Sequence, residues 1–409
     1  MANTKTPSGM RDFLPEEKKI REYLKSVIRE EYRKSGFKEI ETSQIENLEN
    51  LTQSDGGENT KLIFKILKRG EKLKMDEARS EDDLADLGLR FDLTLPLSRF
   101  YSNNKNELPQ IFKAFQMGYV FRAERPQKGR YRAFMQCDID SIGEASNLAE
   151  IELLSCIYRT LSRLGLKGLT FKINDRRLLK KIVLQAGFSE EEFSDVAISL
   201  DKIDKIGEEG IYAELSKKNY SDEAIASLIR VNAEIKAKGL EYTKQIDQEA
   251  FENISKIIDV LESLHEDIRL EFDHSLVRGM GYYTGTIFEV FYEGSNFALG
   301  GGGRYDKMIE KLCGIDLPAC GFSIGYERLV DIIKEEKISL PDSKSLAFFF
   351  SEEDDIKAVM KEAQAFRNEY DEVSVLQKKK KFGKQVSRLK EDGFSHFYDT
   401  QSKEVKELE

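Results

Sequence analysis

Apolar residues recur at helical spacing in three parts of the chain. Residues 15–35 predict an amphipathic helix that ends before Gly36, and residues 147–164 predict a second one. Asn147 followed by Glu150 resembles a capping box at the start of the second helix. Residues 175–265 are rich in Lys, Glu, Ile and Leu at helical spacing and contain no proline. This third part is therefore expected to be an α-helical insertion.

The remaining apolar runs are shorter and predict strands. The runs FKAFQMGYVFRAE and RAFMQCDIDSIG flank the polar, basic stretch RPQKGRY, which indicates a hairpin within residues 110–142. Strands are also expected in 37–45, in KLIFKIL and in LGLRFDLT. Strand chemistry returns in IRLEFD, YYTGTIFEVFYEG and ALGGGGRYD, and helices are expected at 305–312 and from about 325 to 336.

The last part of the chain shows a regular alternation of elements. Residues 337–344 contain the last proline, Pro341, and read as a linker. Strands at 345–350, 372–376 and 395–398 alternate with helices at 353–369 and 382–392, which favours a small, largely parallel sheet. We therefore predict an α+β protein: a domain at 1–336 interrupted at about 175–265, a linker, and an α/β domain at 345–409.

Composition narrows the class of protein. The 409 residues predict two or three domains, and 40% hydrophobic with 34% charged content indicates a soluble globular protein. A net charge of −10 means that any nucleic acid would be bound through local patches. The four cysteines form no CxxC pair, so neither a zinc site nor a disulfide framework is expected. We find no signal peptide and no run of about 18 apolar residues, which indicates a cytosolic protein without a membrane span.

The segment from Phe121 to Asp140 carries the densest candidate chemistry. Its cations are Arg122, Arg125, Lys128, Arg130 and Arg132. Arginine forks suit phosphate oxygens, so a hairpin of this kind can receive a polyphosphate. A solvated, charged hairpin is an equally good interpretation of the composition alone. Gln136 and Asp140 lie four residues apart on the second strand, and alternation places both side chains on one face.

Three further segments hold weaker signals. Arg278 precedes Gly279, Gly281 and two adjacent tyrosines, which would point to opposite faces if extended; a surface arginine in a strand turn is the structural alternative. The glycines of ALGGGGRYD match no phosphate-loop pattern, and a flexible turn is the better interpretation of that run by itself. GFSIGYERL puts Arg328 on the first turns of a helix, and an ordinary helix start is the better interpretation of this segment by itself.

A basic run lies near the end of the chain. LQKKKKFGKQVSRLK contains no acidic residue, so it is a candidate contact for a phosphate backbone. A solvated charged face explains the run equally well.

Taken in order, these segments resemble the class II histidyl-tRNA synthetases, and the resemblance spans nearly the whole chain from TPSGMRDFLP onward. FRAERPQKGRYRAFMQCD is similar to the second class-defining motif and GFSIGYERL to the third. LVRGMGYYTGTIFE and ALGGGGRYD resemble the two histidine-specific signatures, and LGLRFDLT resembles the amino-acid-binding strand. The implied fold is an antiparallel class II sheet flanked by helices, followed by an anticodon-binding domain.

The resemblance also implies roles for individual residues. Histidine would be bound by Asp92, Leu93, Thr94, Gln136, Asp140, Tyr282 and Tyr283. Asp92, Thr94 and Gln136 would hold its α-amino group, while Asp140 and Tyr283 would recognise the imidazole. ATP would be bound by Arg122, Glu124, Arg130, Phe134 and Arg328. Arg278 and Arg122 would be catalytic, with Arg278 stabilising charge on the α-phosphate. The candidate tRNA contacts are Gln127, Lys128, Lys378, Lys379, Lys380 and Lys381.

The implied substrates and partners are ATP, with Mg²⁺ on its phosphates, L-histidine, tRNA-His and a second copy of the chain in a cytoplasmic homodimer. No metal-ligand set within the protein is expected. The chain departs from the family in having Ser43 where the first motif usually has proline, Gly281 where many relatives have Asp, and Asp92 where many have Glu. The last domain looks short and is expected to lack a final strand or helix.

Two other functions would use some of the same features. A synthetase-like paralogue serves as a regulatory subunit in histidine biosynthesis and would share the fold and the dimer, but it should lose the tail domain and much of the catalytic set. This chain keeps Arg122, Arg278 and Arg328. A generic RNA- or nucleotide-binding module would leave the paired histidine signatures without a purpose.

Overall fold

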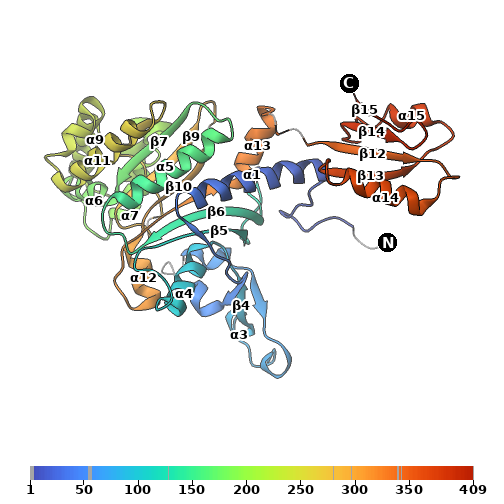
Figure 1. Cartoon of the computed structure of the whole chain (residues 1–409). Helices are drawn as coiled ribbons and strands as arrows, with labels where there is room; N and C mark the ends of the chain where they lie inside the picture. The colour runs from blue at the N-terminus through green and yellow to red at the C-terminus, as the bar shows by residue number, and fades with distance from the viewer. Residues whose placement is uncertain are drawn as a thin grey trace. The chain divides into compact units, whose positions relative to one another are not determined.

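The computed structural model describes residues 4–53, 58–127, 129–279, 281–295, 297–338, 340–341 and 343–408. The chain divides into two compact units, Met1–Ile338 and Ser339–Glu409 (Figure 1). Within the described ranges, no helix has the length and apolar character needed to cross a membrane. Cys137, Cys156 and Cys320 are buried free thiols.

The first unit is built on an eight-stranded sheet in the order β1-β5-β6-β11-β10-β9-β7-β8. Its strands are β1 (Lys38–Glu39), β5 (Phe112–Phe121), β6 (Ala133–Ile142), β7 (Leu169–Asp175), β8 (Arg269–Phe272), β9 (Thr286–Tyr292), β10 (Ala298–Arg304) and β11 (Ala319–Gly325). The six central strands pair antiparallel, and only the edge strands β1 and β8 pair parallel with their neighbours. The predicted hairpin is confirmed, because β5 and β6 pair from Phe112–Ile142 to Phe121–Ala133.

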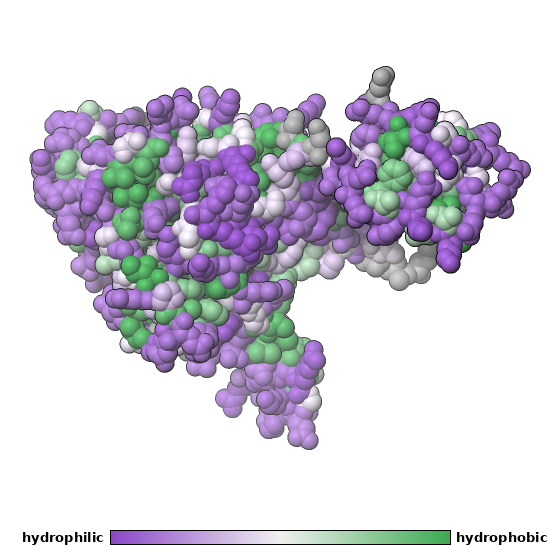
Figure 2. All heavy atoms as spheres, in the orientation of Figure 1, coloured by the Kyte–Doolittle hydropathy of each residue, from purple (hydrophilic) through white to green (hydrophobic). Residues whose placement is uncertain are grey.

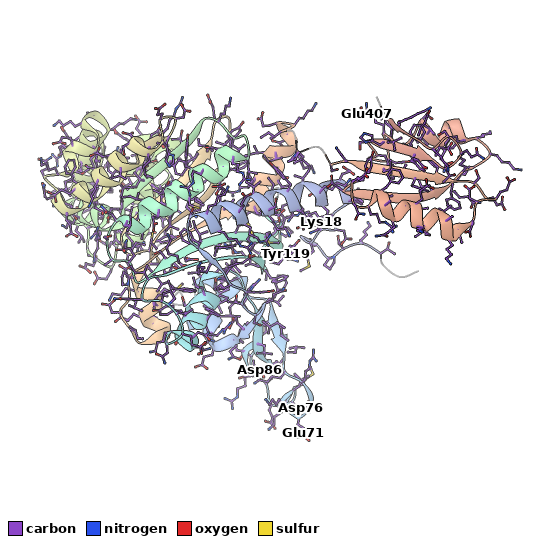
Figure 3. All side chains as sticks on the ribbon, in the orientation of Figure 1. Lys18, Glu71, Asp76, Asp86, Tyr119 and Glu407 are labelled. Atoms are coloured by element: carbon purple, nitrogen blue, oxygen red, sulfur yellow. The ribbon has the colours of Figure 1, made fainter. Side chains whose placement is uncertain are left out.

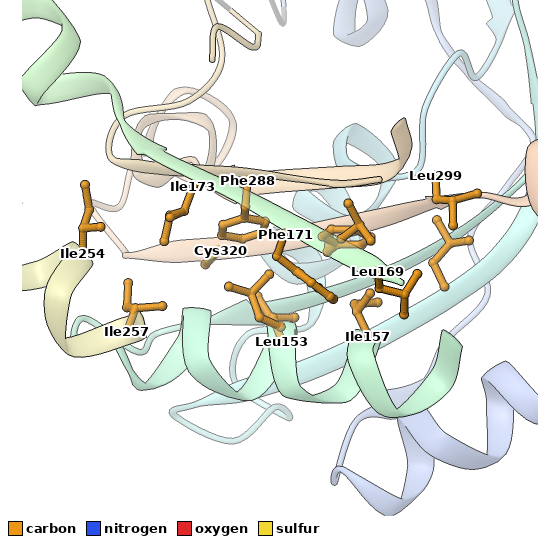
Figure 4. Close-up of a cluster of buried hydrophobic side chains, with 14 of the residues drawn as sticks. Leu153, Ile157, Leu169, Phe171, Ile173, Ile254, Ile257, Phe288, Leu299 and Cys320 are labelled. Carbon is orange, nitrogen blue, oxygen red and sulfur yellow. The ribbon is translucent and has the colours of Figure 1, made fainter. Parts of the chain in front are cut away.

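Helices cover the sheet with their apolar faces. The main ones are α1 (Pro15–Lys34), α5 (Leu148–Arg163), α11 (Gln248–Leu264), α12 (Asp306–Cys313) and α13 (Tyr326–Glu335). Figure 4 shows Leu153 and Ile157 of α5 directed at Phe171 of β7, and all three are fully buried. Burial of each such side chain stabilises the folded state by roughly 1.5–3 kcal/mol. The helices therefore stabilise the sheet from the face on which they pack.

The expected capping box at the start of α5 is wrong. The side chain of Asn147 makes no capping hydrogen bond. Glu150 instead lies in the interior, where Arg304 of β10 donates to it from Nε at 2.7 Å and from Nη2 at 2.6 Å. Burying a carboxylate without a charged partner costs more free energy than leaving a helix start without a side-chain cap.

A three-stranded sheet, β2-β4-β3, forms an arm on the first unit (Figure 1). Its elements are β2 (Ile45–Asn47), α2 (Leu48–Gln53), η1 (Glu58–Leu62), β3 (Lys65–Leu67), η2 (Gly70–Lys72), α3 (Glu81–Leu84) and β4 (Ala85–Leu89). Glu71 and Asp76 lie near the tip of the arm (Figure 3), which is strongly hydrophilic (Figure 2). The strands in 37–45 and 61–94 are shorter than the sequence predicts. Helix α4 (Thr94–Asn104) begins at Thr94, where the strand predicted for LGLRFDLT was expected to end.

The helical insertion between β7 and β8 is observed as expected from the periodicity. It consists of α6 (Arg176–Gln185), α7 (Phe193–Leu200), α8 (Ile203–Lys217), α9 (Asp222–Lys238), α10 (Leu240–Thr243) and α11. Asp175, Ser221 and Asp247 cap α6, α9 and α11 through their side chains. These caps satisfy backbone N–H groups at the helix starts. The helical region itself was predicted from its apolar spacing and its lack of proline.

The second unit is a small α/β sheet in the order β13-β12-β14-β15. It contains β12 (Ser345–Phe350), α14 (Ile356–Phe366), β13 (Glu372–Gln377), α15 (Phe382–Val386), β14 (His396–Asp399) and β15 (Glu404–Glu407). β12 pairs parallel with β13 and β14, as the alternation predicts. The antiparallel β15 was not expected, because its sequence EVKE contains a single apolar residue, Val405.

Candidate active site

Two adjoining pockets open on the first unit. We call one the acidic pocket, since Asp92, Asp138 and Asp140 line it. We call the other the arginine pocket; its cationic lining residues are Arg122, Arg130, Arg278 and Arg328. Arg122 and Arg278 line both pockets and therefore mark the boundary between them.

Strand β6 supplies the floor of the acidic pocket. Gln136, Asp138 and Asp140 alternate along the strand and all line the pocket, so the expected shared face of Gln136 and Asp140 is observed. Tyr305 donates a hydrogen bond from its hydroxyl to Asp140 Oδ1 at 2.6 Å. Burial raises the pKa of Asp140 to about 7, against the lowering effect of the Tyr305 hydrogen bond. The pKa of this carboxyl group therefore lies near neutral pH.

The segment after β4 reaches the acidic pocket from a turn. Strand β4 ends at Leu89, so the expected continuous strand through residue 94 is wrong. Asp92 and Thr94 line the pocket at the start of α4. Leu93 is fully buried in the core and is not among the residues that line either pocket; its carbonyl accepts a hydrogen bond from Gln116 at 3.1 Å.

Both adjacent tyrosines line the acidic pocket, contrary to the expectation for an extended segment. Gly279 has a φ of +46°, and the backbone N–H groups of Tyr282 and Tyr283 both donate to its carbonyl, at 2.8 and 3.2 Å. This turn replaces strand alternation and brings the two rings together, with centroids 4.9 Å apart. Arg278, just before the turn, forms an ion pair with Glu289 of β9.

The glycine run is a strand and not a flexible turn. Gly300 to Gly303 belong to β10, which pairs with β9 and β11 on its two sides. A Cβ on Gly301 would lie only 2.4 Å from Arg278 Nη1. On β11, a Cβ on Gly321 would lie 2.0 Å from Asp140 Oδ1. The glycines therefore leave room above the sheet for the functional side chains.

The arginine pocket brings together the expected ATP residues. Glu124, Arg130, Phe134 and Arg328 line it beside Arg122. The Arg122 guanidinium lies 5.0 Å from the centroid of the Phe134 ring, and its Nε donates to the Phe91 carbonyl at 3.1 Å. Burial lowers the pKa of Arg122 from its ordinary value. The side chain is thus largely desolvated, which strengthens its attraction for an anion.

Arg328 and Arg130 are held differently. Arg328 donates from Nη1 to the Ala298 carbonyl at 2.6 Å, and its guanidinium lies 5.0 Å from the ring centroid of Phe297. The side chain of Arg130 is 59% exposed and approaches Glu124 only at 4.0 Å. Arg328 is therefore pre-positioned, whereas Arg130 is placed only by the turn that carries it.

Strong charge pairing anchors the rear of the arginine pocket. Glu327, at the start of α13, accepts hydrogen bonds from both Arg21 Nη atoms at 2.7 Å and from the Met135 N–H at 3.2 Å. Arg11 contacts the same carboxylate, and its guanidinium lies 3.5 Å from the ring centroid of Tyr131. Helices α1 and α13 and the start of β6 are thereby fixed to one another.

The expected tRNA contacts that the structure describes, Gln127 and Lys378 to Lys381, do not line either pocket. Gln127 is exposed and exchanges backbone hydrogen bonds with Arg130, and Lys128 lies outside the described residues. In the second unit, Lys379, Lys380 and Lys381 are exposed. Lys378 is instead largely buried, paired with Asp399 and donating to Gln401 at 2.9 Å, so it contributes less to the basic surface than its neighbours.

Several residues of the site were not anticipated from the sequence. Asp138 could have been found, because it alternates with Gln136 and Asp140 on one strand. Ser323, Tyr305 and Glu289 could not, since they come from distant strands or a helix start and meet the site only through the sheet. No group of three or more His, Cys, Asp or Glu within the described residues is arranged to hold a metal ion.

Comparison with known proteins identifies the family. The family model described as "Histidyl-tRNA synthetase" matches residues 9–329. The histidine--tRNA ligase of Leifsonia xyli is 47% identical over 361 residues, covering 84% of this chain and 83% of the relative. That of Christiangramia forsetii is 34% identical over 404 residues, covering 93% and 88%.

Solved structures agree with this result. The histidyl-tRNA synthetase from Nostoc sp. PCC 7120 superposes with a TM-score of 0.81 at 26% identity, covering 100% of this chain and 97% of that chain. A Bacillus halodurans protein described as an ATP phosphoribosyltransferase regulatory subunit/histidyl-tRNA synthetase has a TM-score of 0.77 over 98% of both chains, but at 21% identity it shows only the fold.

The large antiparallel sheet, flanked by helices and bearing the site on its open face, has the architecture of a class II aminoacyl-tRNA synthetase, as predicted. Within that class, the chain belongs to the histidyl-tRNA synthetase family.

Proposed function

We propose that the protein is a histidine--tRNA ligase. It reacts L-histidine with ATP to form histidyl-adenylate and pyrophosphate, and then transfers histidine from the adenylate to the 3′ end of tRNA-His. The observation that carries this function is the boundary between the two pockets. Arg122 and Arg278 face both an acidic pocket of amino-acid size and an arginine pocket suited to polyphosphate. The histidine carboxylate and the ATP α-phosphate would meet between these two cations.

Histidine would be held by groups of the acidic pocket. Gln136 Oε1 is buried and, among the described residues, has no hydrogen-bond partner, so it offers an acceptor to the α-ammonium group. Asp92 and Thr94 would complete that subsite. Asp140 and Tyr283 would recognise the imidazole, with Tyr305 orienting Asp140. Polar groups of this kind reject isosteres that lack the ring nitrogens.

ATP would occupy the arginine pocket. Phe134 and Glu124 would position the adenine, while Arg130 and Arg328 would hold the β- and γ-phosphates. Arg122 would bind the α-phosphate together with the histidine carboxylate. Arg278 would stabilise the charge that develops as the carboxylate attacks in line and pyrophosphate leaves. Mg²⁺ would enter with the ATP phosphates and neutralise their charge; Glu124 and Glu289 present oxygen donors of the type that this ion prefers.

The second unit is proposed to bind the anticodon, and the first unit, interrupted by the helical insertion, to be the catalytic domain of a cytoplasmic homodimer. The exposed Lys379, Lys380 and Lys381 support an electrostatic role for the second unit. A regulatory paralogue is the alternative function, and the complete set of Arg122, Arg278 and Arg328 around one boundary disfavours it.

Pyrophosphate exchange into ATP, measured with each of the twenty amino acids, tests the activation step. We expect exchange with histidine alone. Arg278→Ala should reduce it by about 10³-fold or more, because a fixed cation at the reacting phosphate is lost. Arg278→Lys should restore part of the rate. Arg29→Ala is a matched control, since Arg29 pairs with Glu39 on the surface. Absence of histidine-dependent exchange in the wild-type chain would refute the function.

The contribution of the basic run is tested by tRNA binding at several salt concentrations. Replacing Lys379 and Lys380 by Gln should weaken binding and make the slope of log K against log salt shallower by about 0.7–0.9 per lost phosphate contact. Lys357 and Lys361, exposed on α14 of the same unit, provide the matched control pair. Equal Kd values and equal slopes for both pairs would mean that the run is only a solvated face.

A further inference from the structure

A short polar chain connects strands β6 and β11 on the floor of the acidic pocket. Asp138 and Ser323 are directly opposite each other in the sheet register. The Ser323 hydroxyl donates to Asp138 Oδ1 at 2.5 Å, and Gln136 Nε2 donates to the Ser323 Oγ at 3.0 Å. The same Nε2 lies 3.5 Å from Asp138 Oδ2. The NH₂ group of Gln136 is therefore directed at Ser323 and at Asp138.

The direction of this chain follows from the chemistry of its last member. When Asp138 is ionised, its carboxylate can only accept hydrogen bonds, so Ser323 donates to Asp138 and receives from Gln136. The NH₂ end of the Gln136 amide is thereby committed to the sheet. Its Oε1 is left facing the pocket, buried and without a protein partner among the described residues. The pocket consequently presents an acceptor where a flipped amide would present a donor.

We propose that Asp138 is a positioning residue that fixes the amide of Gln136 and thereby selects a protonated α-amino group on the substrate. This inference rests on the proposed function, in which Gln136 binds that group. Asp138 need not touch the ligand, because it acts through Gln136 and Ser323. A reversed amide would direct an N–H group at the ammonium and oppose binding.

In the ligand-free pocket the surroundings of Asp138 favour its protonated form. Burial raises the pKa of Asp138, and Asp140 on the same strand and Asp92 raise it further, while Arg122 and the Ser323 hydrogen bond lower it. An ammonium group entering the pocket adds a positive charge and favours the ionised carboxylate. Ligand binding and the amide orientation therefore reinforce each other.

The test compares two ligands that differ only in the amino group. Isothermal titration of the full chain would give Kd for L-histidine and for 3-(imidazol-4-yl)propionate, which lacks the amine. Asp138→Asn should weaken histidine binding roughly 10- to 100-fold, the effect of losing a hydrogen bond to a charged group. Its Kd for the amine-free ligand should stay within about twofold of wild type, as should the KM for ATP. Ser323→Ala should produce a smaller loss with the same selectivity.

Ser141→Ala is the matched control, since Ser141 is buried on the opposite face of β6 and should change neither Kd. Equal weakening of both ligands by Asp138→Asn would overturn the inference and assign Asp138 a purely structural role, as would no weakening of either. Failure of the wild-type chain to bind histidine would instead overturn the proposed function itself. Thermal denaturation of each variant verifies that it is folded.

Discussion

The two pockets of the first unit share a boundary but differ in chemistry. The acidic pocket holds three carboxyl groups. Asp138 and Asp140 lie on strand β6 and accept hydrogen bonds from Ser323 and Tyr305, and Asp92 lies just before helix α4. The cations of the arginine pocket differ in how they are held. Arg328 donates a hydrogen bond to the Ala298 carbonyl, whereas the side chain of Arg130 is largely exposed. The fixed groups of the acidic pocket suit a small polar ligand, and the cations of the arginine pocket suit a polyanion.

This difference shows how one cleft can combine specificity with chemistry. Carboxyl groups buried in the sheet discriminate well because their partners are fixed. Arginine forks suit phosphates, whose charge is spread over several oxygens. The two arginines at the boundary belong to both environments, so their placement should matter more than that of any residue inside either pocket.

Gly301→Ala should have the largest effect on this comparison. The added Cβ would lie 2.4 Å from Arg278 Nη1 and 2.9 Å from the Phe288 carbonyl, so the guanidinium must shift. A displacement of about 1 Å in a catalytic group costs about 10²-fold in rate, and we expect that loss in kcat for pyrophosphate exchange. Gly383→Ala is the control, because no atom lies within 4 Å of its added Cβ. Unchanged kcat in Gly301→Ala would show that the boundary tolerates movement.

Asp140→Asn should separate the two pockets kinetically. The variant keeps the size of the side chain but replaces one acceptor oxygen by a donor, which is expected to lower kcat/KM for histidine by roughly 10- to 100-fold. The KM for ATP should remain within about twofold, since the arginine pocket is unaffected. Steady-state exchange with each substrate varied in turn measures both constants. Parallel changes in the two constants would mean that the pockets act as one unit.

Phe297→Ala should affect only the arginine pocket, and weakly. Phe297 is 42% exposed and supports the guanidinium of Arg328 by its ring. Loss of an exposed cation–π contact of about 0.5–1 kcal/mol predicts a rise of roughly 2- to 5-fold in KM for ATP, with kcat and the KM for histidine unchanged. Phe297→Tyr should retain the wild-type value. A rise in the KM for histidine would contradict the division between the pockets.

The last expected effect concerns folding and not activity: a pH dependence of stability from Asp140. Its pKa is 3.8 ordinarily and about 7 in the folded chain. Between these values the folded state keeps a proton that the unfolded state has released, so this group makes the protein less stable as pH rises from 3.8 toward 7. Asp140→Asn lacks this contribution. In urea denaturation of ligand-free protein, the variant should gain stability relative to wild type over that pH range; a constant difference would contradict the shift.

Local patterns account for much of the fold. Helix α1, the β5–β6 hairpin and the helical insertion were all predicted, because their apolar periodicity is a local property of the sequence. The parallel pairing of β12 with β13 and β14 was predicted from the alternation of strands and helices. The family resemblance predicts roles for Arg122, Arg278 and Gln136 from the sequence alone. Strand ends were less accurate, since a strand is stabilised by its neighbours in the sheet.

The sequence by itself determined which elements form and which residue types carry the chemistry. Only the tertiary structure decided how these residues face one another. Tyr282 and Tyr283 share a pocket because of a turn at Gly279, and Glu150 is a buried partner of Arg304 and not a helix cap. The glycines of β10 and β11 make room for Arg278 and Asp140. Such relations join positions far apart in the chain, and local periodicity carries no information about contacts across a sheet.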